Sequence, residues 1–221
     1  MPLNLKTPII YLITSGETTP QTTSNSEAFS RLLKLIEAAT AANVSLIQIR
    51  EKQLPTRVLY DLTLKARNIA LGSATRVLVN DRADVARAAE ADGVHLTTTS
   101  LQAPVIRRTF GGDFLIGVST HSLEEARRAR DNQADFAVFG PVFETASKQM
   151  YGEPIGLDKL KEVALDVSPF PILALGGVTL DNTTDCFRAG ASGVAAIRAL
   201  SSPAEIASAV AAIQTRFREQ D

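Results

Sequence analysis

One short segment of the chain carries residue types that suit an anionic ligand. Gly140-Pro141-Val142-Phe143-Glu144-Thr145-Ala146-Ser147-Lys148 follows the apolar run Phe136–Phe139, so we expect it to leave the carboxyl end of a buried strand. Thr145 and Ser147 bring hydroxyl donors, and Lys148 brings a mobile positive charge. These residues also occur in ordinary solvated turns, so the segment alone leaves the function open.

Charged and amide side chains follow two other apolar runs. In Gln48-Ile49-Arg50-Glu51-Lys52, strand alternation places Gln48, Arg50 and Lys52 on one side, and the next run ends in Asn80-Asp81. Three cations (Arg50, Lys52 and Lys148) around the Asp81 carboxylate are what a diphosphate with Mg²⁺ requires. The alternative interpretations are a surface ion-pair cluster at 50–52 and a helix cap at 80–81.

A second group of residues predicts another anion site. Gly176-Gly177 and the Ile197-Arg198 segment follow the last two apolar runs, where barrels often hold a monophosphate on backbone N–H groups. Glycine permits that close approach because it has no side chain, although the pair can also be simple turn punctuation. Two anion sites indicate two substrates or one long phosphorylated substrate. Of the two histidines, His95 is expected to be structural, and His121 is a candidate proton shuttle.

Strand and helix patterns alternate along the whole chain. The apolar runs predict eight strands, covered on both faces, at Ile9–Thr14, Leu46–Arg50, Arg76–Asn80, Gly93–Leu96, Phe114–Val118, Phe136–Gly140, Ile172–Leu175 and Gly193–Ile197. Amphipathic patterns predict helices around Phe29–Ile36 and at about 56–71, 82–91, 101–110, 122–132, 157–166, 180–189 and 203–218. Capping boxes are expected at Ser24/Glu27 and Ser122/Glu125.

This alternation predicts an α/β fold, a single (β/α)₈ TIM barrel that spans residues 1–221 as one domain. The second possibility is a doubly wound open sheet, which would need a G-x-G-x-x-G fingerprint after the first strand. The sequence there is Ser15-Gly16-Glu17, with one glycine, and the barrel is therefore preferred.

Composition excludes several classes of partner. The net charge of -1 argues against a nucleic-acid or anionic-membrane partner, and no apolar run approaches the roughly 20 residues that cross a bilayer. The first six residues lack the layout of a signal peptide. The single cysteine, Cys186, is expected to be buried and suits a reducing compartment, so we expect a cytoplasmic protein. A monomer and a homo-oligomer both remain open alternatives at this point.

The motifs at the predicted strand ends resemble those of the thiamine phosphate synthase and TenI-like superfamily. The resemblance covers residues 9–200 and rests on Gln48-Ile49-Arg50-Glu51-Lys52, Asn80-Asp81, Asp92-Gly93-Val94-His95-Leu96, Gly117-Val118-Ser119, Gly140–Lys148 and Ala174-Leu175-Gly176-Gly177-Val178. It implies a (β/α)₈ barrel that joins hydroxymethylpyrimidine diphosphate to thiazole phosphate and releases diphosphate with Mg²⁺. In the mechanism that it implies, diphosphate leaves first and the thiazole nitrogen captures a pyrimidine carbocation.

The resemblance also implies a role for each candidate residue. Gln48 and Ser119 would contact the pyrimidine. The diphosphate would be held by Arg50, Lys52, Asn80 and Lys148, with Asp81 on Mg²⁺. The thiazole phosphate would be held by Thr145, Ser147, Gly177 and the backbone at Ile197-Arg198.

Three departures from the family pattern matter. The family continues His-Leu-Gly-Gln-x-Asp, with the last Asp a second metal ligand, whereas this chain reads His95-Leu96-Thr97-Thr98-Thr99-Ser100. A neutral Ser100 should lower Mg²⁺ affinity unless water or diphosphate oxygens complete the coordination. Ser147 stands for the usual Thr and keeps the hydroxyl. Arg198 stands for Ser, where it adds charge at the phosphate or obstructs it.

The missing carboxylate leaves two other functions open. TenI-like proteins share the barrel and act as metal-independent thiazole tautomerases with a catalytic histidine, and the segment from Ser119 to Ala126, which contains His121, resembles theirs. A tautomerase, however, has no diphosphate to hold, and this chain keeps Arg50, Lys52, Asn80, Asp81 and Lys148. The third possibility is a sensor that binds a phosphorylated ligand without turnover. The synthase is preferred.

Overall fold

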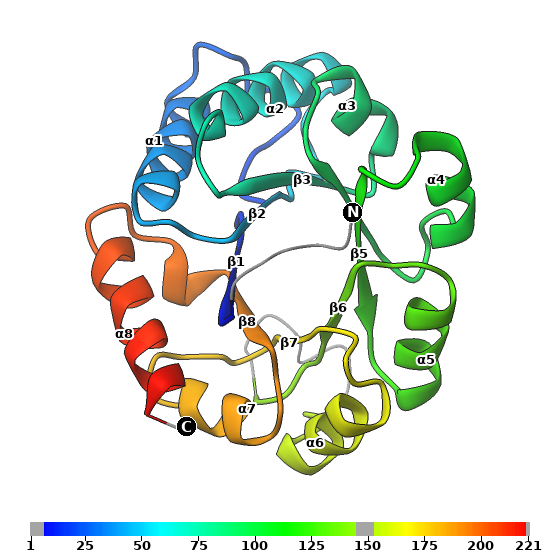
Figure 1. Ribbon diagram of the computed structural model, residues 1–221. Helices are drawn as coiled ribbons and strands as arrows, with labels where there is room; N and C mark the ends of the chain where they lie inside the picture. Colours follow the sequence, from blue (N-terminus) through cyan, green and yellow to red (C-terminus); the bar gives the residue numbers. More distant parts are fainter. Residues whose placement is uncertain (1–6, 145–152, 220–221) are drawn as a thin grey trace.

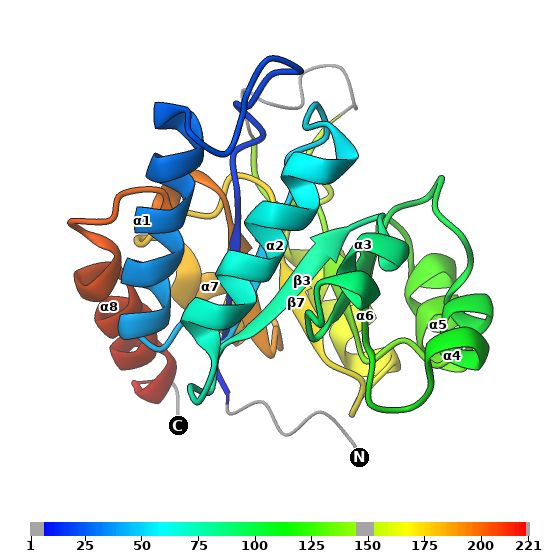
Figure 2. The same cartoon turned by 90° about the horizontal axis from the view of Figure 1, so that it is seen from above.

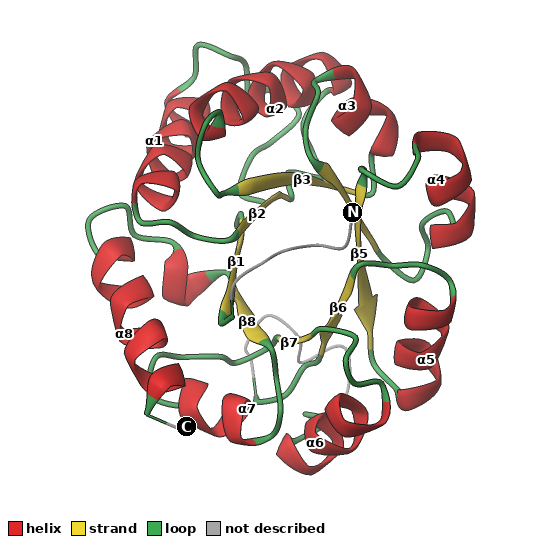
Figure 3. Ribbon diagram, viewed as in Figure 1, coloured by secondary structure: helices red, strands yellow, loops and turns green. Residues whose placement is uncertain are grey.

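Eight parallel strands close into a barrel, and the helices surround it (Figure 1; Figure 3). The computed structural model describes residues 7–144 and 153–219. Each strand pairs with the next along the chain, and β1 pairs with β8, for example Tyr11 with Ala195. The predicted (β/α)₈ barrel is confirmed.

The strands are short, as in other closed parallel barrels. Their bounds are β1 Ile9–Ile13, β2 Leu46–Ile49, β3 Arg76–Asn80, β4 Gly93–Leu96, β5 Leu115–Thr120, β6 Phe136–Phe139, β7 Ile172–Ala174 and β8 Gly193–Ala196. All eight predicted strands exist. The largest difference is at β5, which continues through Ser119 and Thr120 because these polar residues pair with Val138 and Phe139 of β6.

The helices alternate with the strands. Their bounds are α1 Glu27–Ala41, α2 Thr56–Ala70, α3 Ala83–Ala88, α4 Ala103–Phe110, α5 Leu123–Asp131, α6 Leu157–Asp166, α7 Thr183–Arg188 and α8 Ile206–Arg218, with one 3₁₀ turn at Arg198–Leu200. Neighbouring helices pack side by side, as α1 and α2 show in Figure 2. No helix in these ranges is long and apolar enough to cross a bilayer.

Helix starts are where the sequence-based prediction is least accurate. The Ser24/Glu27 box is wrong, because Glu27 is the first helical residue and Ser24 Oγ donates instead to Asp61 Oδ2 at 3.2 Å. The Ser122/Glu125 box is half formed, since Ser122 Oγ accepts from Glu125 N at 3.2 Å. The last helix begins at Ile206 rather than 203, because residues 203–205 form a turn.

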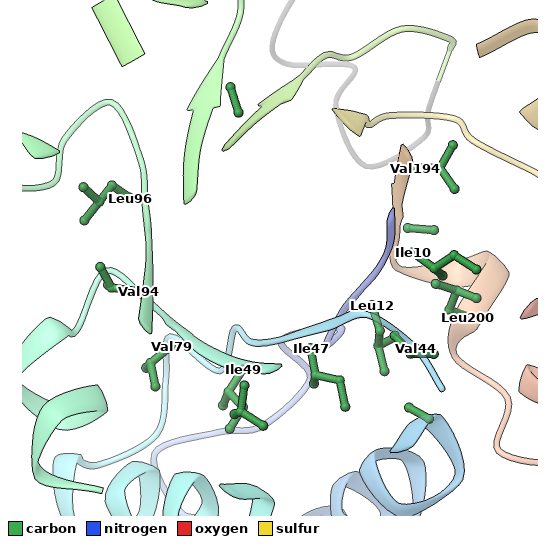
Figure 4. Close-up of a cluster of buried hydrophobic side chains, with 14 of the residues drawn as sticks. Ile10, Leu12, Val44, Ile47, Ile49, Val79, Val94, Leu96, Val194 and Leu200 are labelled. Atoms are coloured by element: carbon green, nitrogen blue, oxygen red, sulfur yellow. The ribbon is translucent and has the colours of Figure 1, made fainter. Parts of the chain in front are cut away.

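Apolar side chains form two layers on either side of the barrel wall. Ile10, Leu12, Ile47 and Val79 point outward to the helices (Figure 4). The alternate positions, such as Ile9, point inward and fill the barrel. The period of two along each strand therefore also decides which polar side chains reach the interior near the carboxyl ends.

The loops before the even-numbered strands repeat one conformation. α1, α3, α5 and α7 are each followed, two residues after the helix, by a residue with positive φ, namely Asn43 (58°), Glu90 (53°), Gln133 (63°) and Gly190 (87°). The next residue then donates back into the helix, as Ala134 N does to Ala129 O at 3.0 Å. This is the hydrogen bond of a left-handed helix cap, where glycine is the usual residue.

Gln133→Gly should therefore stabilise the fold. Relief of left-handed strain exceeds the extra chain entropy of glycine, so we expect a gain of about 0.5–1 kcal/mol in the free energy of unfolding. Urea denaturation measures this. Asn132→Gly is the matched control, because Asn132 has an ordinary φ of -91° and should not gain stability. Equal gains for both variants would contradict the explanation.

The single cysteine is structural. Cys186 lies on α7 with a free, buried thiol, as expected, and burial raises its pKa to about 12. The thiol is therefore protonated at neutral pH and is a poor nucleophile.

Candidate active site at the carboxyl ends of the strands

Polar side chains take over the inner positions near the carboxyl ends of β2 to β5. Gln48, Asn80 and His95 are buried, with 2%, 9% and 2% exposure, and Ser119 is half-buried. Gln48 Nε2 donates to Asn80 Oδ1 at 3.0 Å, and His95 Nε2 lies 2.9 Å from Ser119 Oγ. Four neighbouring strands thus line one side of the barrel mouth with amide, imidazole and hydroxyl groups.

The Gln48 side chain has one unsatisfied hydrogen-bond acceptor among the described residues. Its Oε1 is buried and has no hydrogen-bond partner among the described residues. A buried acceptor without a partner costs roughly 1–3 kcal/mol. Such an atom is expected to accept a hydrogen bond from a ligand, which agrees with the predicted contact between Gln48 and a substrate.

A cavity of about 240 Å³ opens at the ends of β2, β3 and β4. Lys52, Asn80 and Asp81, which the sequence predicted to act together, all line it. Thr97 and Thr99 from the loop after β4 also line it, and their hydroxyls were not predicted as site groups. Glu51 and Arg82 line it too, so two cations, two carboxylates and several neutral oxygens border the same space.

Asp81 is held in an unusual backbone conformation. Its φ of 63° is left-handed, and its N–H donates to His95 O at 2.8 Å, which ties the end of β3 to β4. Left-handed backbone in a residue other than glycine often marks functional sites. The Asp81 side chain is exposed to the cavity, while the neighbouring Arg82 pairs with Asp84 at 2.6 Å.

Arg50 lies on the inner side of this cluster. Its Nη1 is so close to Gly16 that a Cβ there would approach it to 3.3 Å, and its charge acts on His95. Its backbone N–H donates to Thr14 Oγ1 at 2.8 Å. Arg50 does not line the 240 Å³ cavity but faces the barrel interior beside it.

Glu51, between Arg50 and Lys52 in sequence, is buried at the end of β2. The carboxylate is 3% exposed and accepts from Gly16 N, Thr18 N and Thr18 Oγ1 at 3.1, 3.2 and 2.7 Å. These bonds fasten the β1–α1 connection to the end of β2. A surface ion-pair cluster at residues 50–52 is therefore wrong, because the central carboxylate is buried and hydrogen-bonded elsewhere.

His95 has partners on both ring nitrogens, as expected for a structural histidine. Nδ1 lies 3.3 Å from the Tyr11 hydroxyl, and Nε2 contacts Ser119. Burial, followed by the charge of Arg50, lowers the pKa of His95 to about 3. The imidazole is therefore neutral at physiological pH.

His121 lies at the end of β5 and is exposed. Its Nδ1 contacts Gly140 O, and its backbone N–H donates to Glu125 Oε2 at 2.6 Å. A carbonyl only accepts, so Nδ1 carries the proton in this contact. His121 therefore joins β5 to the start of the segment that follows β6.

The glycines after β7 are closely packed. Gly177 has a φ of 65°, and an added Cβ would lie 2.7 Å from Phe143 Cβ. Phe143 N donates to Gly176 O at 3.0 Å, so this turn is bound to the segment after β6. β7 and β8 are neighbours, which places Ile197 and the exposed Arg198 at the same end of the barrel.

The loop after β4 is held by hydrogen bonds between its own residues Thr97 and Ser100. Ser100 Oγ accepts from Thr97 N at 2.8 Å and lies 3.1 Å from Thr97 Oγ1. Ser100 lines a different cavity, of about 380 Å³, between α4 and α5, and Thr97 alone is common to both cavities. The hydroxyls that face the Asp81 cavity are therefore those of Thr97 and Thr99.

The predicted site residues are thus partly brought together. Gln48, Arg50, Lys52, Asn80 and Asp81 lie at the ends of β2 and β3, where the last three share the 240 Å³ cavity, whereas Ser119 on β5 lines the 380 Å³ cavity. Gly177, Ile197 and Arg198 lie after β7 and β8. Thr145, Ser147 and Lys148 lie outside the described residues. Tyr11, Glu51, Thr97 and Thr99 were missed, and strand alternation could have pointed to Tyr11 alone.

Polar and charged groups at the carboxyl ends of a closed parallel barrel are the arrangement of the TIM-barrel enzymes. Sequence comparison narrows this class. Residues 10–200 match the family described as "Thiamine monophosphate synthase", and the chain belongs to this family.

Relatives with known names agree with this assignment. The chain is 44% identical over 169 residues to a putative thiamine-phosphate synthase of Geobacter sulfurreducens, covering 76% of this chain and 79% of that protein. It is 40% identical to the thiamine-phosphate synthase of Moorella thermoacetica, covering 80% and 84%. The solved thiamine phosphate pyrophosphorylase from Pyrococcus furiosus superposes with a TM-score of 0.76 at 28% identity, covering 95% of each chain.

Proposed function

We propose that this protein condenses hydroxymethylpyrimidine diphosphate with thiazole phosphate and releases diphosphate. The observation that carries the proposal is the shared cavity of Lys52, Asn80 and Asp81, beside Arg50 and Gln48. Family membership and the names of the relatives support the same reaction. The substrates are small and phosphorylated. A cytoplasmic location belongs to the proposal and is supported by the free Cys186 thiol.

Different residues of the chain bind the pyrimidine, the diphosphate and the thiazole phosphate. Gln48 and Ser119 contact the pyrimidine, while Arg50, Lys52 and Asn80, with Lys148, bind the diphosphate. These preorganised donors stabilise the negative charge that develops as diphosphate leaves and the pyrimidine carbocation forms. Thr145, Ser147, Gly177 and the backbone at Ile197-Arg198 bind the thiazole phosphate and present the ring nitrogen to the carbocation. The roles of Thr145, Ser147 and Lys148 rest on sequence.

The oxygen donors of the cavity fit Mg²⁺. Asp81, Asn80 and the hydroxyls of Thr97 and Thr99 are hard ligands, although the described ranges contain no group of three His, Cys, Asp or Glu that could hold a metal. Mg²⁺ is commonly bound by one or two carboxylates together with substrate phosphates. When bound at Asp81, it would neutralise charge on the diphosphate.

One assay tests the proposed function. Purified protein is given either the two synthase substrates or thiazole carboxylate phosphate, each with Mg²⁺ and with EDTA. We expect diphosphate release only with the synthase pair and Mg²⁺. Isomerisation that persists in EDTA and disappears in His121→Ala would instead establish a tautomerase. Thiazole phosphate binding without turnover would establish a sensor.

A carboxylate added to the cavity should strengthen metal binding. Thr99 lines the cavity with Asp81, whereas Ser100 lines the neighbouring one. We therefore expect Thr99→Asp to bind Mn²⁺ at least tenfold more tightly than wild type without diphosphate, measured by electron paramagnetic resonance. Ser100→Asp is the matched control with the same charge and should gain less. A larger gain in Ser100→Asp would show that the loop rearranges to the geometry implied by the family pattern.

A further inference from the structure

Three aromatic rings fill the barrel interior beneath Ser119. Tyr11 and His95 have ring centroids 5.7 Å apart, and Tyr11 packs edge-on against Phe136 at 5.5 Å. Gly117 leaves room for them, since a Cβ there would lie 2.8 Å from His95 Nδ1 and would also meet the Phe136 ring. The rings are therefore fixed in position, and their hydrogen bonds have little freedom.

The positions of the hydrogen atoms on Tyr11 and His95 follow from the number of hydrogen-bond donors and acceptors in this cluster. Tyr11 is 0% exposed, and burial raises its pKa, so its hydroxyl keeps its hydrogen. Within the described ranges, His95 Nδ1 is the one hydrogen-bond partner of that hydroxyl. The His95 ring is 2% exposed and contacts the Tyr11 and Ser119 hydroxyls, an environment for a neutral imidazole with one N–H hydrogen, on either Nδ1 or Nε2.

Only one tautomer satisfies every buried donor. If Nδ1 carried the hydrogen, it would donate to Tyr11, and the Tyr11 hydrogen would be buried without an acceptor, which is unfavourable. If Nε2 carries it, Tyr11 donates to Nδ1 and Nε2 donates to Ser119 Oγ at 2.9 Å. The Ser119 hydrogen then remains available to a ligand.

We propose that Tyr11 and His95 are positioning residues that fix the Ser119 hydroxyl as a hydrogen-bond donor to the substrate. Gln48 Oε1 has no hydrogen-bond partner in residues 7–144 and 153–219, so the barrel mouth then offers one donor and one acceptor. An aminopyrimidine presents the complement, a ring nitrogen that accepts and an exocyclic amino group that donates. This inference rests on the proposed function, and it adds which edge of the pyrimidine the site selects and which residues enforce the selection.

The first test needs no substrate. The chain has two histidines, so ¹⁵N-histidine NMR with His121→Gln as the assignment variant isolates the His95 signals. We expect a protonated Nε2 and a bare Nδ1 in wild type, and loss of this single tautomer in Tyr11→Phe. A protonated Nδ1 in wild type would overturn the inference, whether or not the protein has the proposed activity.

The second test measures substrate recognition by a double-mutant cycle. Tyr11→Phe should raise KM for hydroxymethylpyrimidine diphosphate about tenfold, the effect of losing one oriented hydrogen bond, with kcat changed less. Ser119→Ala should do at least as much, and Tyr11→Phe should add nothing in the Ser119→Ala background. Additive effects would contradict action through Ser119.

Control variants separate positioning from structure. Tyr60→Phe makes the same change on α2, where Tyr60 packs on the outer core, and should leave KM unchanged. His95→Gln keeps a donor near the place of Nε2 and should retain more binding than His95→Asn, which reaches only toward Tyr11. Equal losses in both His95 variants, with circular dichroism showing folded protein, would indicate a packing role alone. Absence of any turnover in wild type would refute the proposed function and leave the tautomer result standing.

Discussion

Asp81→Asn should lower kcat/KM for the condensation by about 10²–10³-fold, the usual cost of removing one group that stabilises charge in the transition state. Asp81 places its carboxylate in the cavity that also contains Lys52 and Asn80. Asparagine is isosteric and tolerates the left-handed φ of 63°, so the backbone should be preserved. The loss should be greatest at low Mg²⁺, because the variant lacks the carboxylate that we propose as the metal ligand. Diphosphate release measured over a Mg²⁺ titration gives the result.

Asp158→Asn is the matched control for charge. It removes one carboxylate from the exposed first turn of α6, on the outer ring of helices. We expect its kcat/KM and Mg²⁺ dependence to equal those of wild type. If Asp81→Asn retained full Mg²⁺-dependent activity, Asp81 would not be a metal ligand, and the proposed diphosphate site would need another carboxylate.

Gly177→Ala should raise KM for thiazole phosphate by about 10²-fold, the scale expected when a binding group is displaced by about 1 Å. A Cβ at this position would lie 2.7 Å from Phe143 Cβ and would also contact Glu144 O, so the turn or the segment after β6 must move. Both flank the proposed phosphate site. KM for the pyrimidine substrate should change far less, because Gln48 on β2 and Ser119 on β5 do not flank the turn after β7.

Gly72→Ala is the control for Gly177→Ala, because it introduces left-handed backbone strain without a steric clash of the added Cβ. Gly72 has a similar φ of 80°, but an added Cβ there would have no neighbour within 4 Å. It should lose about 0.5–1 kcal/mol of stability, since left-handed strain exceeds the chain entropy saved by removing glycine, with unchanged KM values. If Gly177→Ala behaved in the same way, the Gly176-Gly177 turn would have only a structural role.

The fold could be predicted because each unit repeats a strong local signal. Runs such as Ile9–Ile13 and Phe136–Phe139 are apolar at every position, since inward residues fill the barrel and outward residues pack on helices. Element ends were less accurate for physical reasons. Ser119 and Thr120 extend β5 by pairing with β6, and long-range pairing of this kind leaves no local mark in the sequence.

The site was predictable to the extent that strand alternation determines direction. Gln48 and Asn80 could be assigned to the interior from their register, and the structure places them in hydrogen-bond contact. The role of Glu51 could not be predicted, because it depends on Gly16 and Thr18, more than 30 residues away in sequence. The direction of the Thr97–Ser100 hydroxyls also depends on bonds within that loop rather than on residue type.

The most direct test is a crystal structure of the protein with Mg²⁺, diphosphate and hydroxymethylpyrimidine. We predict diphosphate in the cavity of Lys52, Asn80 and Asp81, with Mg²⁺ between its oxygens and the Asp81 carboxylate, and the pyrimidine ring against Gln48 and Ser119. Diphosphate bound elsewhere, such as the 380 Å³ cavity between α4 and α5, with Asp81 facing only solvent, would contradict the proposed site.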